Sequence, residues 1–148
     1  MHRLTPDDDG TTHDAARPAP ARGPAWGAPR PTHTLVLDGV EVAGCWVATT
    51  RAERTQGLLG TQGLDGALWL RRCANVHTFG MRYALDVVVV TRTGRIRAIE
   101  TLAPRRASRP RPYGLDTVEM AAGRAAALGM RPGQHLALRP AMSERGRP

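Results

Sequence analysis

Short runs of apolar residues, separated by turns that contain glycine or proline, dominate the chain from about residue 33 onward. Asp38-Gly39 stands between two such runs, and this dipeptide favours a two-residue β-hairpin because both turn positions need positive φ. We therefore expect Thr34–Leu37 and Val40–Ala48 to be paired antiparallel strands. The run LDVVVV, which starts at Leu85, does not alternate between apolar and polar positions, and this indicates a strand buried on both faces.

Capping and turn signals define the remaining elements. Thr50 and Glu53 have the spacing of a capping box, which predicts a short helix from Arg51 to Leu58 with Gly60 at its end. Further strands are expected in the segments 67–70, 95–103, 115–123 and 131–138, and a second short helix is expected in 124–130, ending at Gly129.

The expected fold therefore has about seven short strands and two short helices. Tight turns between consecutive strands favour antiparallel pairing, and short elements favour curvature, so we expect a mainly β, α+β fold: one compact, antiparallel, barrel-like sheet. The segments 1–32 and 140–148 have almost no aliphatic side chains and are expected to be disordered tails of a globular domain at 33–139. Trp26 would then anchor a partner or fold loosely onto the domain.

The charge of the chain changes this picture little. The formal net charge is +8, but every basic residue is arginine, which is typical of a GC-rich coding source. Only 4% of the residues are aromatic, and none of these alternates with the arginines as a platform for stacking bases. Net charge alone indicates solubility and non-specific association, so we do not expect nucleic-acid binding.

The cysteines and the chain termini indicate a cellular location. Cys45 and Cys73 are too few for a disulfide framework and are expected to be buried thiols in a reducing compartment. No apolar run approaches the roughly 18 residues of a membrane span. The first residues, MHRLTPDDDG, lack the apolar core of a secretory signal, so a cytoplasmic protein is expected.

Cys73 and His77 are the first candidates for chemistry. If their segment is extended, residues four apart lie about 13 Å from one another, too far for one zinc ion with ligand bonds of about 2.0–2.3 Å. A catalytic triad of Cys73, His77 or His135, and Asp86 would need a nucleophile elbow, and none surrounds the cysteine. We therefore expect no metal, no other cofactor and no catalytic residue.

Asp86 is the carboxylate that most needs an explanation. It lies between Leu85 and four valines, so it is expected in the core, where a charge requires partners. Arg54, Arg82 and the amides around Phe79–Met81 are the candidates. A structural clasp of this kind is favoured over general-base chemistry.

Several short motifs occur in an order that resembles a known family. Glu53-Arg54 and Gly57-Leu58 are followed by GALWL, VHTFGMRYALDVVVV, VEMAAG and PGQHLAL. From about Thr34 to Leu138 the chain resembles domain of unknown function 192 (DUF 192), an uncharacterised bacterial and archaeal family. The resemblance implies a small β-rich domain and no established activity. Many relatives carry a signal peptide, and some actinobacterial relatives lie near pilus-assembly or secretion genes.

Two functional interpretations stay open. The first is a monomeric, non-enzymatic binding or accessory module, linked to pilus assembly or secretion, whose arginine-rich loop Arg105–Arg111 with Tyr113 contacts an acidic protein partner. The second is a site for a small anion or small molecule around Arg54, His77 and Asp86, which would leave enzymatic activity open. The candidate ligand-binding or clasp residues are Glu53, Arg54, His77, Thr78, Phe79, Met81 and Asp86.

Overall fold

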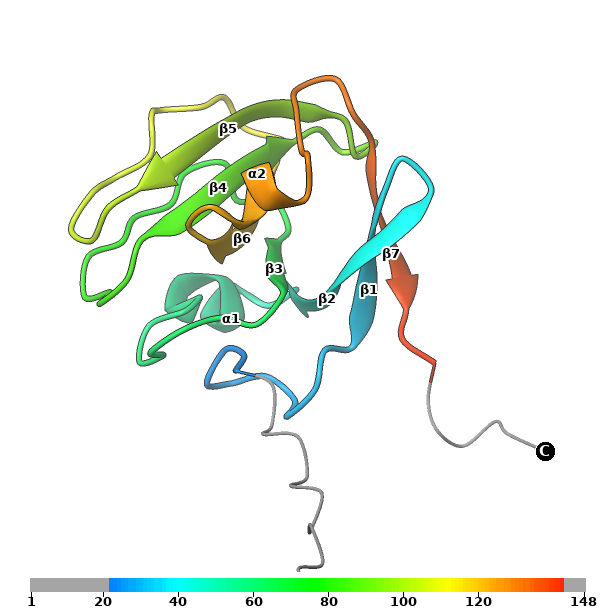
Figure 1. Cartoon of the computed structure of the whole chain (residues 1–148). Coiled ribbons are helices and arrows are strands. Elements are labelled where there is room, and N and C mark those ends of the chain that lie inside the picture. Colours follow the sequence, from blue (N-terminus) through cyan, green and yellow to red (C-terminus); the bar gives the residue numbers. More distant parts are fainter. Residues whose placement is uncertain (1–21, 143–148) are drawn as a thin grey trace, which may run out of the picture.

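The computed structural model describes residues 22–142, so the rest of the two expected tails, 1–21 and 143–148, lies outside the described residues (Figure 1). The strands are β1 (His33–Leu37), β2 (Val40–Ala48), β3 (Ala67–Leu70), β4 (Leu85–Val90), β5 (Ile96–Leu102), β6 (Asp116–Ala121) and β7 (Leu136–Pro140), and the helices are α1 (Arg51–Gln56) and α2 (Arg124–Ala127). The predicted mainly β fold, with seven short strands and two short helices, is confirmed.

The seven strands form one sheet in the order β5-β4-β6-β3-β2-β1-β7. Five of the six neighbouring pairs are antiparallel, but β2 and β3 run parallel, so the prediction of a wholly antiparallel sheet is wrong at this pair. Parallel neighbours need a crossover connection, and the long segment between β2 and β3, which contains α1, supplies it.

The sheet curls until its two end strands meet at one point. An isolated bridge pairs Arg95, just before β5, with His135, just before β7. Beside it the amide of Leu136 donates to the carbonyl of Gly94 at 2.8 Å. Within residues 22–142 no longer ladder joins β5 to β7, so the sheet is curved as expected but is not closed into a barrel.

Strand β4 contributes to all three buried apolar clusters of the described structure because its side chains alternate between the faces of the sheet, with Val87 and Val89 in a small cluster with Leu102. All six of its residues are buried, as the non-alternating LDVVVV run predicts. Val88 and Val90 pack on the inner face, in the cluster that contains Ala125 of α2. Leu85 packs on the outer face, in the cluster that contains Leu58 just after α1. The two helices thus cover opposite faces of the sheet.

Residues 22–32, which the sequence assigns to a tail, pack against the outer face. The indole nitrogen of Trp26 donates to the carbonyl of Gly57 at 3.0 Å, and Trp26 packs against the outer cluster. The indole nitrogen of Trp46 in turn donates to the carbonyl of Ala28 at 2.9 Å. Both tryptophans therefore attach this segment to the domain.

The first and last strands of the sheet lie side by side. Strand β1 pairs with β2 on one side and with β7 on the other, both antiparallel. The amide of Ala141, just after β7, donates to the carbonyl of Thr32, just before β1, at 3.0 Å. The chain thus enters and leaves the sheet at the same place.

Candidate functional site

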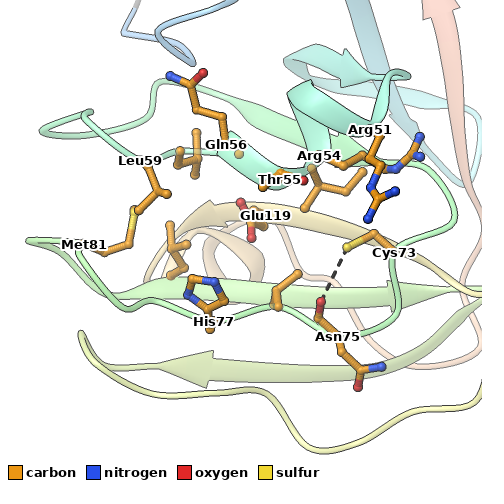
Figure 2. Close-up of a pocket in the computed structure, with 15 residues that line it drawn as sticks. Arg51, Arg54, Thr55, Gln56, Leu59, Cys73, Asn75, His77, Met81 and Glu119 are labelled. Carbon is orange, nitrogen blue, oxygen red and sulfur yellow. Dashed lines mark hydrogen bonds between the residues drawn. The ribbon is translucent and has the colours of Figure 1, made fainter.

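A cavity of about 290 Å³ opens on the outer face, between α1, the loop 71–84 and the strands β3, β4 and β6 (Figure 2). Its walls combine aliphatic side chains with a few charged and polar ones. The lining residues are Arg51, Arg54, Thr55, Gln56, Gly57, Leu58, Leu59, Leu70, Cys73, Asn75, Val76, His77, Met81, Leu85 and Glu119.

Helix α1 forms one wall and is fixed by the predicted capping box. The Thr50 hydroxyl accepts from the amide of Glu53 at 3.1 Å, and the Glu53 carboxylate accepts from the amide of Thr50 at 3.0 Å. These bonds to Thr50, with weaker ones from Thr49, lower the pKa of Glu53. The Glu53 side chain is therefore used by the helix cap and does not line the cavity. The helix ends at Gln56, earlier than expected, because Gly57 takes a φ of 49°.

The arginines of α1 face the cavity without a carboxylate partner. Arg54 donates from Nη1 to the carbonyl of Thr49 at 2.6 Å, which holds the side chain but leaves its charge uncompensated. Arg51 also lines the cavity, and no side chain in the described part of the chain bonds to its guanidinium. The wall formed by α1 is thus positively charged.

Glu119 of β6 is the charged residue at the floor of the cavity. It pairs across the sheet with Leu68 of β3 and Val87 of β4, so its side chain shares the outer face with these two. Only 4% of Glu119 is exposed, and none of the residues from 22 to 142 donates a hydrogen bond to its carboxylate. Burial raises the pKa of Glu119 to about 7.

Cys73 lies beside this carboxylate on the loop 71–84 and is half-buried. Its Sγ donates to the carbonyl of Asn75 at 3.5 Å. Burial raises the pKa of the Cys73 thiol, the charge of Glu119 raises it further, and Arg54 opposes both. Cys73 is therefore a protonated thiol that is close enough to Glu119 and Arg54 to respond to both charges.

His77 reaches the same cavity as Cys73. The segment between them is an irregular loop and not a strand, so the extended spacing does not hold and both residues line the cavity. No hydrogen bond joins the two side chains in the described structure. Instead, Nδ1 of His77 accepts from the amide of Phe79 at 3.2 Å, and the two rings lie 5.4 Å apart. Phe79 itself is exposed and lies outside the cavity lining.

Thr78 fixes the path of this loop. The side chain is fully buried, and its hydroxyl donates to the carbonyl of Ala103 at 2.6 Å and accepts from the amide of Arg106 at 2.9 Å. A bridge between His77 and Ala107 adds to the junction. Thr78 thus has a structural role, and it attaches the cavity wall to the loop that follows β5.

Asp86 lies on the inner face and does not line the cavity. Its Oδ1 accepts from the hydroxyl of Thr101 at 2.7 Å, and its Oδ2 accepts from the amide of Ala125 at 3.0 Å. The partners that the sequence suggested, Arg54, Arg82 and the amides around Phe79–Met81, are not the ones it uses. The reason is strand alternation: Leu85 faces the cavity, so Asp86 faces α2.

The structure thus divides the candidate residues. Arg54, His77 and Met81 line the cavity, whereas Glu53, Thr78, Phe79 and Asp86 do not. Sequence reasoning missed Glu119 and Arg51. The signal for Glu119 was present, because the run DTVEMA places a carboxylate between Val118 and Met120, as LDVVVV does for Asp86.

The arginine-rich loop after β5 is partly bonded to the domain. The amide of Arg109 donates to the carboxylate of Glu100 at 3.2 Å, and the guanidinium of Arg111 lies 3.9 Å from the same carboxylate. Tyr113 is fully exposed. Across residues 22–142, no three His, Cys, Asp or Glu side chains gather in a group that would hold a metal ion. No helix in that range is long and apolar enough to cross a membrane.

These features define a class: a small, mainly β domain with a mixed, curled sheet and a charged, ligand-sized cavity on its outer face. The chain belongs to the DUF192 family, described as Uncharacterized ACR, whose model matches residues 34–138. No match was found among curated proteins.

Two crystal structures share the fold. A protein of unknown function from Novosphingobium aromaticivorans DSM 12444 is 25% identical, with a TM-score of 0.65 over 86% of this chain and 99% of that chain. A candidate transcription regulator from Sinorhizobium meliloti 1021 is 21% identical, with a TM-score of 0.64 over 76% of this chain and 98% of that chain. The second likeness concerns the fold alone.

Proposed function

We propose that this protein is a non-enzymatic binding module that takes a small ligand in the cavity between α1, the loop 71–84 and β6. The observation that carries the proposal is the Glu119 carboxylate, which is buried and has no hydrogen-bond donor among the described residues. A buried charge normally has a partner because its desolvation is otherwise uncompensated. A carboxylate that lines a cavity without one is a candidate contact for a ligand.

Binding is favoured over catalysis by the state of the neighbouring groups. The raised pKa of Cys73 keeps its sulfur protonated, whereas a nucleophilic cysteine needs a thiolate. His77 accepts from a backbone amide of its own loop and makes no hydrogen bond to Cys73. The residues around the cavity therefore lack the pairing of nucleophile and base that covalent catalysis requires.

A ligand-induced melting screen of the full chain tests this proposal. A panel of metabolite-sized amines, carboxylic acids, zwitterions and neutral polar compounds is added to the wild type and to Glu119→Gln. A compound at a hundred times its dissociation constant adds about 2.7 kcal/mol to the free energy of unfolding, which raises the melting temperature by roughly 10 °C. We expect at least one compound to stabilise the wild type and to lose most of this effect in Glu119→Gln.

Glu41→Gln is the matched control, because Glu41 is an exposed glutamate of β2 that pairs with Arg139 at 2.8 Å and does not line the cavity. It removes the same charge without touching the proposed site, so the ligand should stabilise it as well as the wild type. A screen without any stabilising compound, or equal stabilisation of Glu119→Gln, would contradict the proposal.

A further inference from the structure

The cavity holds charges of both signs and an apolar end, and from this arrangement we infer that its ligand is a small zwitterion with an apolar side chain, such as a free aliphatic amino acid. Its ammonium group pairs with Glu119, its carboxylate pairs with Arg51 and Arg54, and its apolar part lies between Leu59 and Met81. This inference rests on the proposed function and specifies the chemical class of the ligand.

The floor of the cavity supplies the group that would bind the ammonium of the ligand. Glu119 is 4% exposed and receives no hydrogen bond from the described residues, so both carboxylate oxygens are available to a donor that enters the cavity. An ammonium group presents three N–H donors and a positive charge, and charge-assisted hydrogen bonds of this kind are the strong ones. A cation at this point compensates the buried carboxylate.

The wall formed by α1 supplies the groups that would bind the carboxylate of the ligand. Arg51 has no hydrogen-bond or ion-pair partner in the described structure, and Arg54 bonds only to the neutral carbonyl of Thr49. The nearest acidic residue on the helix, Glu53, is used by the helix cap. Two guanidinium groups without a carboxylate partner favour an anion, and a carboxylate has two oxygens that can each accept from a guanidinium group.

The two ends of the cavity differ in charge. In Figure 2, Arg51, Arg54 and Cys73 lie at one end, and Glu119 lies near the middle. Leu59 and Met81 lie at the other end, on the same side of Glu119 as the uncharged amide of Gln56 and the ring of His77. A ligand with both charges at one end and an apolar body at the other matches this distribution. The volume of about 290 Å³ is at the small end of ligand pockets, which favours a molecule with few heavy atoms.

Ligands with one charge fit the cavity less well. A simple carboxylic acid would pair with the arginines but would bring a second negative charge to Glu119. A simple amine would pair with Glu119 but would face two arginines. Only a ligand with both charges compensates both sets of groups, because like charges at short range in a buried site repel strongly.

The pH dependence of binding follows from the protonation of Glu119. Burial raises its pKa to about 7, and an ammonium group pairs only with the ionised carboxylate. Below pH 7 the ligand must therefore displace a proton, so its affinity is expected to fall by up to about tenfold for each pH unit. The other charged or titratable groups facing Glu119 are Arg51 and Arg54 from α1 and Cys73, His77 and Tyr83 from the loop 71–84.

Isothermal titration calorimetry of the full chain tests the ligand class with four probes. L-leucine carries both charges and an apolar side chain, 3-methylbutylamine lacks the carboxylate, 4-methylpentanoate lacks the amine, and glycine lacks the apolar part. We expect L-leucine to bind at least about tenfold more tightly than each of the other three, a difference of about 1.4 kcal/mol. Below pH 7, L-leucine should release about one proton per molecule bound, read from buffers that differ in ionisation enthalpy.

Single substitutions test each proposed contact between the ligand and the cavity. Glu119→Gln should weaken the binding of L-leucine by at least about tenfold and abolish its pH dependence. His77→Gln changes another residue of the cavity lining and should retain the pH dependence. Arg51→Ala and Arg54→Ala should weaken binding, and Arg97→Ala, an exposed arginine of β5 outside the cavity lining, should not.

The outcomes separate this inference from the proposed function. If 4-methylpentanoate or 3-methylbutylamine binds as tightly as L-leucine, the inferred ligand class is wrong but the proposed binding site is still supported. The same holds if a compound of another class binds through Glu119 while L-leucine does not. If neither these probes nor the wider panel stabilises the protein, both are wrong.

Discussion

Glu119 and Asp86 are buried carboxylates on neighbouring strands, and they differ in what surrounds them. Asp86 accepts one hydrogen bond at each oxygen, from Thr101 and from Ala125. Glu119 accepts none from the described residues and faces a cavity. A buried carboxylate thus stabilises the fold on the inner face of the sheet, whereas on the outer face a buried carboxylate is available to a ligand.

The pH dependence of stability should reveal the buried Glu119. Its folded-state pKa of about 7 exceeds the ordinary value of 4.5, so the folded protein holds this proton more tightly than the unfolded chain does. The free energy of unfolding therefore falls as the pH rises from about 4.5 to 7, by on the order of 3 kcal/mol from this group. Glu119→Gln removes the effect and should be more stable than the wild type at pH 8 but similar at pH 5. Urea unfolding at the two pH values measures this, and a pH-independent difference would contradict it.

Replacing Asp86 should cost stability without affecting the cavity. Asp86→Ala leaves the amide of Ala125 and the hydroxyl of Thr101 without their acceptor, and we expect a loss of about 2–3 kcal/mol. Asp86→Asn keeps one acceptor oxygen and should lose less. Urea unfolding gives both values, and stabilisation by any ligand found should be unchanged in Asp86→Asn, because residue 86 lies on the opposite face. A variant that folds normally but no longer responds to the ligand would place Asp86 in the site.

At the scale of elements, the cavity is formed by pieces that depend on distant attachments. The loop 71–84 is fixed through Thr78 to the loop after β5, and the chain just after α1 is fixed through Gly57 to Trp26. These two walls of the cavity are therefore held by segments that do not themselves line it.

Trp26 should stabilise the fold through its contacts on the outer face. Trp26→Ala removes the hydrogen bond to Gly57 and the packing of the indole on the outer cluster, so we expect a loss of about 2 kcal/mol. Thermal unfolding would show it as a lower melting temperature. Tyr113→Ala is the matched control, because Tyr113 is a fully exposed aromatic residue and its removal should change little. Equal effects of the two substitutions would show that the contacts of Trp26 do not stabilise the fold.

Local sequence patterns were sufficient to predict most of the helices and strands. Asp38 and Gly39 both take positive φ, as the hairpin requires, and the capping box of Thr50 and Glu53 forms as predicted. The parallel pairing of β2 with β3 was not predictable in this way. It depends on where the crossover connection places β3 in the sheet, and no local sequence pattern specifies that position.

The site was harder to predict for the same reason. Arg54, His77 and Met81 are among the residues that the sequence singled out, but the cavity they line depends on the path of the loop 71–84, which long-range hydrogen bonds such as those of Thr78 fix. The run DTVEMA indicates that Glu119 lies in a buried strand, between Val118 and Met120. That its side chain faces a cavity depends on both neighbours of β6 and on the loop 71–84, which its own segment does not encode.

At the scale of the whole molecule, the curl of the sheet depends on a close approach at Gly94. Its φ is 93°, and a Cβ there would collide with the carbonyl oxygen of Leu136, whose amide donates to Gly94. This contact lies beside the one bridge that joins the two ends of the sheet within residues 22–142, where Ile96 also exchanges backbone hydrogen bonds with Gln134 and Gly133. The close approach of the two ends at this point therefore requires a residue without a side chain at position 94.

A pair of glycine variants tests this dependence. Gly133 has nearly the same φ, 94°, but a Cβ there would meet nothing within 4 Å. Gly133→Ala should therefore cost only the backbone strain, about 1–2 kcal/mol. Gly94→Ala should cost about 1–3 kcal/mol more, because the added methyl group forces the two ends of the sheet apart. Chemical unfolding compares them, and equal losses would show that the close approach does not matter.

The hydrogen bond between Ala141 and Thr32 has a consequence for the order of the elements along the chain. Because the first and last strands are neighbours, a short linker could join them, and the backbone could instead be cut in an exposed turn without separating any paired strands. The sheet should therefore tolerate circular permutation. By the same geometry, the domain could be inserted as a unit into a surface loop of another protein, with little distortion of the host.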